Sequence, residues 1–335
     1  MKNNLSPSFF HKSNTGHTPG YALAVIRNGQ VIELSCYGYA NINNQIFITD
    51  ATPFRLASLT KQFTSLAILQ LIDKGYFKLN SKIAKLVNFD HNRVFNDINV
   101  HNLLTHTSGL PDYEEIIYKS KNNSYVNNND AMSIIRKFEQ LNFRPNSKFE
   151  YSETGYVILK TIIENISGKS YTRYLEKNIF RKLNMKNSFV ATNNTLLKKF
   201  RNRAIGYKKV SGNYQEYDDD YLNFIIGNDG IYASISDMSL WMLSWRNKFL
   251  LSDRLYTKAL TNQIQVTDDV SYGYGLYIDN INKMIYHTGS WVGFNNIICW
   301  NYSNDLILVI LANLCFCPDR NKRLKIVKNY MKYYQ

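Results

Sequence analysis

Ser58 and Lys61 form a Ser-x-x-Lys pair whose residue types and spacing suit covalent chemistry. A serine hydroxyl is a poor nucleophile until a neighbouring group takes its proton. A lysine three residues further along a helix lies on the same face, so its amine can reach the serine oxygen. The lysine acts as a base only if burial or nearby cations lower its pKa. Because such a match also arises by chance in a chain of this length, the pair needs support from other residues.

Tyr151-Ser152-Glu153 is a second stretch with chemical potential, and it opens a predicted helix after Pro145. A tyrosine beside cationic groups can relay a proton between a serine and a leaving group. The chain contains 25 tyrosines, so packing is the ordinary role of any single one. Tyr151 is therefore a candidate for proton transfer only in combination with other residues.

His287-Thr288-Gly289-Ser290 follows an apolar run and is predicted to lie on a strand. A strand edge facing the Ser58 helix can supply one backbone N–H of an oxyanion hole, with the N–H of Ser58 as the other. Gly289 lets the backbone approach a ligand closely, and His287 brings a titratable group near the tyrosine. The alternative is a strand histidine that simply has its hydrogen bonds satisfied.

The elements that must position these residues differ between the ends and the middle of the chain. Residues 21–39 form two β-rich runs around Asn28-Gly29, which predicts a type I′ hairpin. A second hairpin is predicted from residues 295–300 and 306–311, followed by an amphipathic helix over 321–334. Helices are also predicted over 56–74, ending at Gly75, and over 156–166, 171–183 and 236–248. Residues 119–130 are polar and are predicted to form an exposed loop.

This arrangement predicts an α/β (α+β) fold. The expected architecture is a central antiparallel sheet built from both chain termini and flanked by helices, with a mostly helical domain inserted. The sheet domain is assigned to residues 1–85 and 205–335, and the inserted domain to residues 86–204. The cleft between the two is the expected location of the chemistry.

The order of the three stretches resembles the serine β-lactamase and penicillin-binding-protein superfamily. The closest branch is similar to the class C β-lactamase-related esterases, D-stereospecific peptidases and transacylases. Framework segments over about residues 20–330 agree. They are Leu-Leu-Thr-His-Thr-Ser-Gly-Leu-Pro at 103–111, Gly-Ile-Tyr-Ala-Ser at 230–234 with Asp237 and Trp241, and Tyr-Gly-Tyr-Gly at 272–275. A β-lactamase/transpeptidase-like fold is what the resemblance implies.

The resemblance also implies roles for individual residues. Ser58 would be the acylated nucleophile, with Lys61 and Tyr151 sharing the general base and acid work. His287 stands where many relatives have lysine, and Ser290 matches the residue whose N–H completes the oxyanion hole. Glu153, Gly289 and Trp291 are the candidate substrate-binding residues. The implied reaction is a two-step acyl transfer through an acyl-Ser58 ester, and it needs no cofactor or metal.

Two departures from the family pattern bear on the substrate. Glu153 replaces the usual asparagine, and a carboxylate only accepts hydrogen bonds, so it would repel a substrate carbonyl. Placed near Lys61 it would raise the lysine pKa and hinder that base, unless its side chain points away from the site. His287 in place of lysine weakens the charge that would hold a β-lactam or peptide carboxylate. Both departures favour an esterase, amidase or aminopeptidase-like hydrolase, with substrates that present an N–H or ammonium group. Asp229, where relatives often have a small residue, affects the shape of the cleft.

Three functions remain open at this point. The leading hypothesis is a serine hydrolase acting on small ester, amide or peptide substrates. The second is a penicillin-binding D,D-carboxypeptidase or β-lactamase acting on cell-wall peptides or β-lactams. The third is a non-catalytic member of the fold retained for binding or self-assembly. A fluorophosphonate probe separates the third from the others, and a labelled penicillin separates the second from the first.

Composition and charge bear on which partners and which cellular compartment are expected. The net charge of +14 is interpreted as lysines scattered over the surface, because no nucleic-acid recognition motif accompanies the basic stretches, so no nucleic-acid partner is expected. The four cysteines show neither a disulfide framework nor zinc-ligand spacing. No stable membrane insertion is expected, since no apolar run approaches 18 residues. No signal peptide is visible, which predicts a cytoplasmic protein, or a periplasmic or secreted one if a leader was removed. The oligomeric state cannot be inferred from the sequence.

Overall fold

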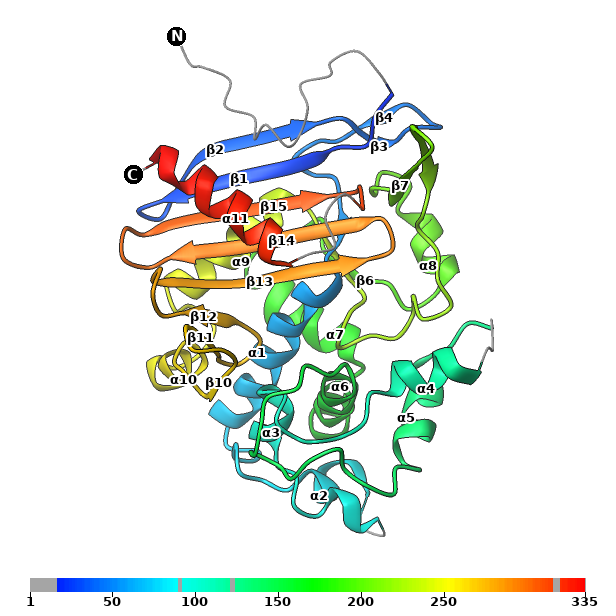
Figure 1. Ribbon diagram of the computed structural model, residues 1–335, viewed down its shortest axis with the longest axis vertical. Helices are drawn as coiled ribbons and strands as arrows, with labels where there is room; N and C mark the ends of the chain where they lie inside the picture. Colours follow the sequence, from blue (N-terminus) through cyan, green and yellow to red (C-terminus); the bar gives the residue numbers. More distant parts are fainter. Residues whose placement is uncertain (1–16, 90–91, 121–123, 316–319, 335) are drawn as a thin grey trace.

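A large antiparallel sheet forms the centre of the protein, seen here in a computed structural model that describes residues 17–89, 92–120, 124–315 and 320–334 (Figure 1). Within these residues the sheet has eight strands in the order β10-β11-β12-β13-β14-β15-β1-β2. β1 pairs with β15, Tyr21 lying opposite Ala312, so the two ends of the chain meet inside one sheet. The strands are β1 Tyr21–Arg27, β2 Gln30–Tyr37, β10 Ile264–Gln265, β11 Val270–Tyr272, β12 Tyr277–Asp279, β13 Met284–Trp291, β14 Phe294–Asn301 and β15 Leu306–Ala312. The predicted sheet from both termini is confirmed.

Both predicted hairpins are present. β1 and β2 are joined by Asn28 and Gly29, whose φ angles of 51° and 78° are the two positive values that a type I′ turn requires. β14 and β15 form the second hairpin in antiparallel register. These turns are encoded locally, which is why the sequence alone predicts them.

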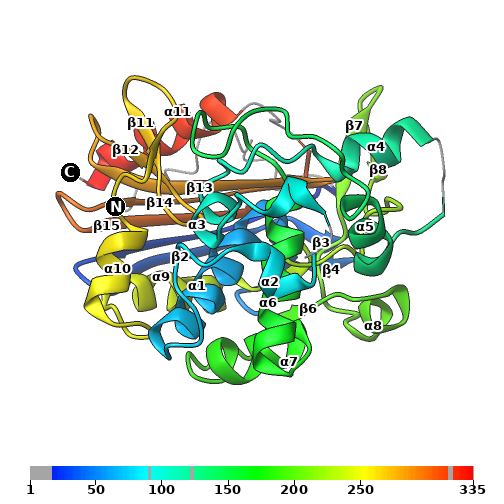
Figure 2. The same cartoon turned by 90° about the horizontal axis from the view of Figure 1, so that it is seen from below.

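Each face of the large sheet is covered by helices. The helices α1 (Thr60–Asp73) and α9 (Ile235–Arg246) cover one face, and α11 (Arg320–Met331) lies across the other (Figures 1 and 2). Along β15, Leu306, Leu308 and Ile310 pack on the α11 side, whereas Ile307, Val309 and Leu311 pack on the α1 and α9 side. A strand buried on both faces needs an unbroken apolar run, and β15 has one.

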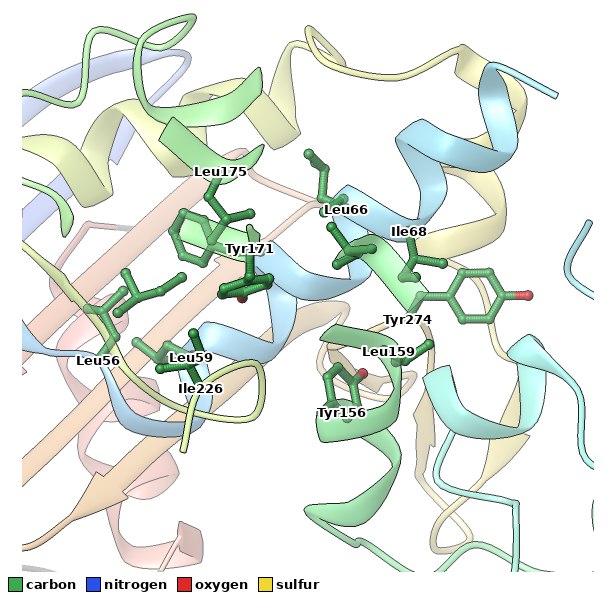
Figure 3. Close-up of a cluster of buried hydrophobic side chains, with 14 of the residues drawn as sticks. Leu56, Leu59, Leu66, Ile68, Tyr156, Leu159, Tyr171, Leu175, Ile226 and Tyr274 are labelled. Carbon is green, nitrogen blue, oxygen red and sulfur yellow. The ribbon is translucent and has the colours of Figure 1, made fainter. Parts of the chain in front are cut away.

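A helical region packs against α1 at the side away from the sheet. Tyr156 and Leu159 of α6 and Tyr171 and Leu175 of α7 surround the buried side chains of α1 and its preceding turn (Figure 3). The helices of this region are α2 Ile83–Val87, α3 Val100–Leu104, α4 Tyr113–Ser120, α5 Asn128–Ile135, α6 Thr154–Ser167 and α7 Tyr171–Leu175, with the short turns η2 Arg93–Phe95 and η3 Glu176–Phe180. The helix α8 Asn194–Lys199 packs separately, with its Leu197 against Phe224 and Tyr232. The helix predicted over 171–183 is thus α7 continued by the π-helical turn η3.

The exposed loop predicted over residues 119–130 is wrong at both ends. α4 extends to Ser120, and α5 begins at Asn128. The side chain of Asn127 accepts the N–H groups of Asn129 and Asp130, and the Asp130 carboxylate in turn accepts the N–H of Asn127 at 2.9 Å. This reciprocal cap starts the helix, so the asparagine run is a helix start rather than continuous loop. Residues 121–123 lie outside the described residues.

Smaller sheets connect the region around Ser58 to the rest of the chain. β5 and β6 flank β9, and Leu56, just after β5, donates its N–H to Ile231 of β9 at 2.8 Å. The remaining strands are β3 Tyr39–Asn41, β4 Ile46–Phe47, β5 Phe54–Arg55, β6 Phe189–Val190, β7 Tyr207–Val210, β8 Asn213–Glu216 and β9 Ile231–Ala233. The remaining helices are α10 Asp253–Ala259 and the short turns η1 Ala57–Leu59 and η4 Lys332–Tyr334. The division of the chain into two domains stays a prediction.

Candidate active site

Ser58 lies in the 3₁₀ turn η1, directly before α1, rather than in the first turns of the long helix as predicted. The preceding residue Ala57 has φ 52°, a left-handed conformation that is unusual for a residue with a Cβ. Hydrogen bonds fix the chain on the N-terminal side of the turn. Asn296 of β14 donates its side-chain amide to the carbonyl of Arg55 at 2.8 Å, in addition to the Leu56 contact with β9. The serine is therefore held where two sheets and a helix meet.

Gly289 brings β13 into backbone contact with this turn. A Cβ built at Gly289 would lie 2.1 Å from the carbonyl oxygen of Leu56, a distance that no side chain can occupy. Ser290 follows on β13, and its hydroxyl accepts a hydrogen bond from Asn295 at 3.0 Å. The segments that carry the Ser58 and Ser290 backbone N–H groups are therefore neighbours.

Lys61 is the centre of the polar contacts around Ser58. Its side chain is fully buried, and its Nζ donates to Ser58 Oγ at 3.1 Å, to Glu153 Oε2 at 2.6 Å and to the carbonyl of Asn228 at 3.2 Å. These three acceptors match the three hydrogens of an ammonium group. Glu153 thus points into the site, and the alternative in which it turns away is not what the structure shows.

Tyr151 lies in the loop before α6 rather than within a helix. Its ring stacks on that of His106, with centroids 4.3 Å apart, and Lys61 Nζ lies 4.9 Å from its centre. Burial raises the pKa of the Tyr151 phenol well above its usual value, although a hydrogen bond with Ser58 opposes that shift. The structure therefore brings Ser58, Lys61 and Tyr151 together.

His287 lies on β13, as predicted, but its ring nitrogens are engaged within the protein. Nδ1 is 2.7 Å from the carbonyl of Thr288, and Nε2 is 3.2 Å from the hydroxyl of Tyr272. The ring centroid of His287 is 6.3 Å from that of Tyr151. Because a carbonyl only accepts, Nδ1 carries a proton and donates it to the carbonyl of Thr288. Both ring nitrogens of His287 therefore contact protein groups, and the ring lies near Tyr151.

The hydroxyl of Tyr272 contacts a second histidine, His106, in addition to His287. His106 Nδ1 accepts the N–H of Ser152 at 3.2 Å, so the proton of a neutral His106 resides on Nε2, which is 3.3 Å from Tyr272 Oη. Burial lowers the pKa of His106 well below its usual value. Sequence reasoning assigned His106 and Tyr272 only to framework motifs. Their contact joins residues 166 positions apart, which no local pattern reports.

Two further carboxyl groups lie beside Glu153 and were missed by sequence reasoning. Asp112 accepts the N–H groups of Glu153 at 2.8 Å and of Glu114 at 3.0 Å. Glu114 accepts the hydroxyl of Tyr113 at 3.1 Å. Burial raises the pKa of all three carboxyl groups, and their mutual repulsion adds to the shift at Glu114 and Glu153. Glu153 alone bonds to Lys61, and the charge of Lys61 opposes the pKa shift at all three carboxyl groups.

Replacing Glu114 with glutamine is expected to stabilise the protein above neutral pH. A carboxyl whose folded-state pKa is raised contributes stability at acid pH that is lost as pH rises through that pKa. Glutamine keeps the oxygen that accepts from Tyr113 and removes the charge. We expect a melting temperature higher by about 2 °C at pH 8 and unchanged at pH 4, measured by thermal unfolding across pH. The exposed Glu115→Gln is the control, and an equal shift in both variants would contradict the prediction.

Asp229 has a structural partner that explains its presence near the cleft. The buried Arg55 donates to Asp229 Oδ2 from Nε at 3.1 Å and from Nη2 at 3.0 Å, and it also donates to the carbonyl of Asn223 at 2.9 Å. Asn223 in turn accepts the indole N–H of Trp291 at 2.8 Å. The ion pair therefore connects β5, just before Ser58, to the segment that holds Trp291.

Neither a membrane-spanning helix nor a metal site is present among the described residues. None of the helices there is both long and apolar enough to span a membrane. No group of three or more histidine, cysteine, aspartate or glutamate side chains in that part of the chain has a geometry suited to a metal ion.

Comparison with known proteins gives consistent matches. The sequence profile of the family described as Beta-lactamase matches residues 8–326. Protein flp of Staphylococcus aureus (strain N315) is 29% identical over 313 residues, which cover 91% of this chain and 61% of that protein. Penicillin-binding protein 4* of Bacillus subtilis (strain 168) is 26% identical over 306 residues, covering 85% and 66%. The chain thus spans a little under two thirds of either curated relative.

A solved structure agrees as well. The octameric penicillin-binding protein homologue from Pyrococcus abyssi superposes with a TM-score of 0.80 at 27% sequence identity, covering 90% of this chain and 70% of that one. The fold class and the superfamily resemblance predicted from the sequence are both confirmed. The residue roles are not tested by these matches.

Proposed function

The chain belongs to the Beta-lactamase family, and from that premise we propose that it is a serine hydrolase that cleaves small esters or amides through an acyl-Ser58 intermediate. The contact that carries the proposal is the one between Lys61 Nζ and Ser58 Oγ at 3.1 Å, with Lys61 Nζ also 4.9 Å from the centre of the Tyr151 ring. A nucleophile within hydrogen-bonding distance of a base is the geometric requirement for covalent catalysis.

The proton route follows from the contacts of Lys61. Lys61 must be neutral before its amine can take the Ser58 proton, and the nearest acceptor for its own proton is Glu153, 2.6 Å away. Burial raises the pKa of that carboxyl, which makes the ionised Glu153 a better acceptor for the lysine proton. Ser58 Oγ then attacks the acyl carbon and gives its proton to Lys61. Tyr151 protonates the leaving group and recovers a proton from Lys61, and water releases the acyl group by the same route.

The negative charge that develops on the acyl oxygen needs hydrogen-bond donors. The backbone N–H groups of Ser58 and Ser290 are proposed to supply them, because the contact between Gly289 and Leu56 brings their segments together. Donors fixed in place before the reaction are worth more than donors that must reorganise. Trp291 and Gly289 would border the bound acyl group.

A substrate with a free ammonium group fits the charge of the site. Glu153, Glu114 and Asp112 share the charge of one lysine, and burial raises the pKa of each, with mutual repulsion adding to the shift at Glu153 and Glu114. A second cation would favour their ionised forms. We therefore expect aminoacyl esters or amides with an unblocked amino group to be preferred.

Replacing Glu153 with asparagine tests this preference. The p-nitrophenyl ester of an amino acid and its N-acetylated counterpart are compared by kcat/KM. The native enzyme is expected to prefer the free amine, and the variant to lose at least about tenfold of that preference, because a hydrogen bond to a charged group is worth about 1.5–3 kcal/mol. The ratio separates this preference from a loss of rate that affects both substrates equally.

The pH dependence of the ratio adds a second readout. The native preference is expected to fall as pH drops through the raised pKa of Glu153, since the protonated carboxyl attracts an ammonium less. The asparagine side chain of the Glu153→Asn variant does not titrate, so the variant lacks that contribution. Rapid hydrolysis of penicillin by the native enzyme, unaffected by the substitution, would contradict the proposed substrate class.

A penicillin-binding D,D-peptidase is the second candidate, favoured by the name of the Bacillus subtilis relative. Covalent labelling by a fluorescent penicillin at a rate above that of ester hydrolysis would support it. A chain that no fluorophosphonate labels at Ser58 would instead support a role in binding or self-assembly.

A further inference from the structure

Arg323 contacts the catalytic strand from the opposite face of the sheet. It lies on α11, its side chain is buried at 5% exposure, and its Nη1 donates to the carbonyl oxygen of Gly289 at 3.1 Å. Gly289 shares its peptide group with Ser290. The guanidinium therefore hydrogen-bonds to the same peptide whose N–H is proposed to face the acyl oxygen.

The geometry of a peptide group gives this contact a consequence. In a trans peptide the C=O and the N–H point in opposite directions, so a donor that holds the Gly289 carbonyl also sets the direction of the Ser290 N–H. A charged donor at the oxygen polarises the amide and makes its N–H a stronger donor, because hydrogen bonds in a chain reinforce each other. We propose that Arg323 is a positioning residue for the oxyanion hole and acts through the Gly289–Ser290 peptide. This inference rests on the proposed function.

The helix that carries Arg323 is held by apolar packing. Leu324, Val327, Tyr330 and Met331 of α11 pack on β1, β14 and β15. This packing sets the position of the guanidinium independently of the active site. A buried guanidinium is expensive unless it is hydrogen-bonded, so its place behind a catalytic peptide calls for a reason beyond filling space.

The same helix supplies a matched control. Lys328 Nζ pairs with Asp279 of β12 at 3.0 Å, so it also ties α11 to the sheet, but at a strand that carries none of the proposed catalytic residues. Lys328→Met removes a cation from α11 without touching the Gly289 carbonyl. Arg323→Met removes the proposed polarising contact.

The experiment compares the native enzyme, Arg323→Met and Lys328→Met in ester hydrolysis and in inhibition by phenylboronic acid. A boronic acid forms a tetrahedral adduct with the serine and places an oxygen in the oxyanion hole. We expect Arg323→Met to lower kcat about tenfold, to weaken boronate binding by a similar factor and to leave KM unchanged. This loss is smaller than the ~10²–10³-fold seen when an oxyanion-hole donor is removed outright. Lys328→Met should leave all three constants within about twofold of native.

Equal kcat and boronate affinity in Arg323→Met and native enzyme would overturn the inference, as would an equal loss in Lys328→Met. If Arg323→Met does not fold, Arg323→Lys and Arg323→Gln replace it. The kcat is then expected to fall from the native enzyme to Arg323→Lys and further to Arg323→Gln. Equal kcat values in the three proteins would contradict the inference. Fluorophosphonate labelling of native Ser58 distinguishes a failure of the proposed function from a failure of this inference. Absence of label defeats the proposed function and this inference together, whereas label with no Arg323 effect defeats this inference alone.

Discussion

Replacing Ser58 with alanine is expected to lower kcat/KM for p-nitrophenyl esters by roughly 10⁴- to 10⁶-fold, which is the range lost when a serine nucleophile is removed from a hydrolase. No other hydroxyl replaces it, because Lys61 donates to Ser58 Oγ directly and the left-handed Ala57 together with the Leu56 contact fixes that oxygen in place. The side chain is only half-buried, so the melting temperature should change little. Steady-state kinetics and thermal unfolding measure the two effects.

Active-site labelling provides the control for this prediction. A fluorophosphonate probe should label the native chain on the peptide that contains Ser58 and should leave Ser58→Ala unlabelled. Ser290→Ala is the matched hydroxyl variant, because Ser290 is proposed to act through its backbone N–H, and its labelling should persist. If the Ser58 variant retains native hydrolysis, another residue is the nucleophile and the proposed mechanism fails.

Features encoded over short stretches of sequence could be predicted. The Asn28-Gly29 turn depends on the conformations of two residues, and Lys61 reaches Ser58 because residues three apart share a helix face. The apolar run of β15 signals burial on both faces without further information. Each of these features depends on residues that are close together in the sequence, so the sequence alone is enough to predict it.

Contacts between distant segments could not be predicted in the same way. Glu153 was a candidate from its motif, but its direction toward Lys61 depends on how α6 packs against α1, 92 residues away in sequence. Asp112 and Glu114 follow a recognisable loop, yet nothing local indicates that burial brings them beside Glu153. Tyr272 is similar, since its role depends on two histidines from other elements. The electrostatics of the site therefore emerge only in the folded chain.

Replacing Lys61 with methionine is expected to lower kcat by about 10³-fold or more, because the general base is lost while the apolar stem is kept. The substitution should also destabilise the protein, since it leaves the largely buried Glu153 without its ammonium partner. Removing one member of a buried ion pair lowers the free energy of unfolding by about 3–5 kcal/mol. Because the Glu153 side chain is 18% exposed and so partly solvated, we expect a loss near or below the lower end of that range. Kinetics and urea unfolding check the two effects.

The double variant Lys61→Met/Glu153→Gln separates the two roles of Lys61. A carboxyl with a raised pKa destabilises the fold as pH rises through that pKa, so the stability lost in Lys61→Met should grow from acid to neutral pH. Glutamine removes the unpaired charge, so the double variant should recover most of the stability and lose that pH slope. Its kcat should stay as low as that of Lys61→Met, because neither residue can then accept a proton. Recovery of activity along with stability would mean that Lys61 only neutralises Glu153, and that Tyr151 alone activates Ser58.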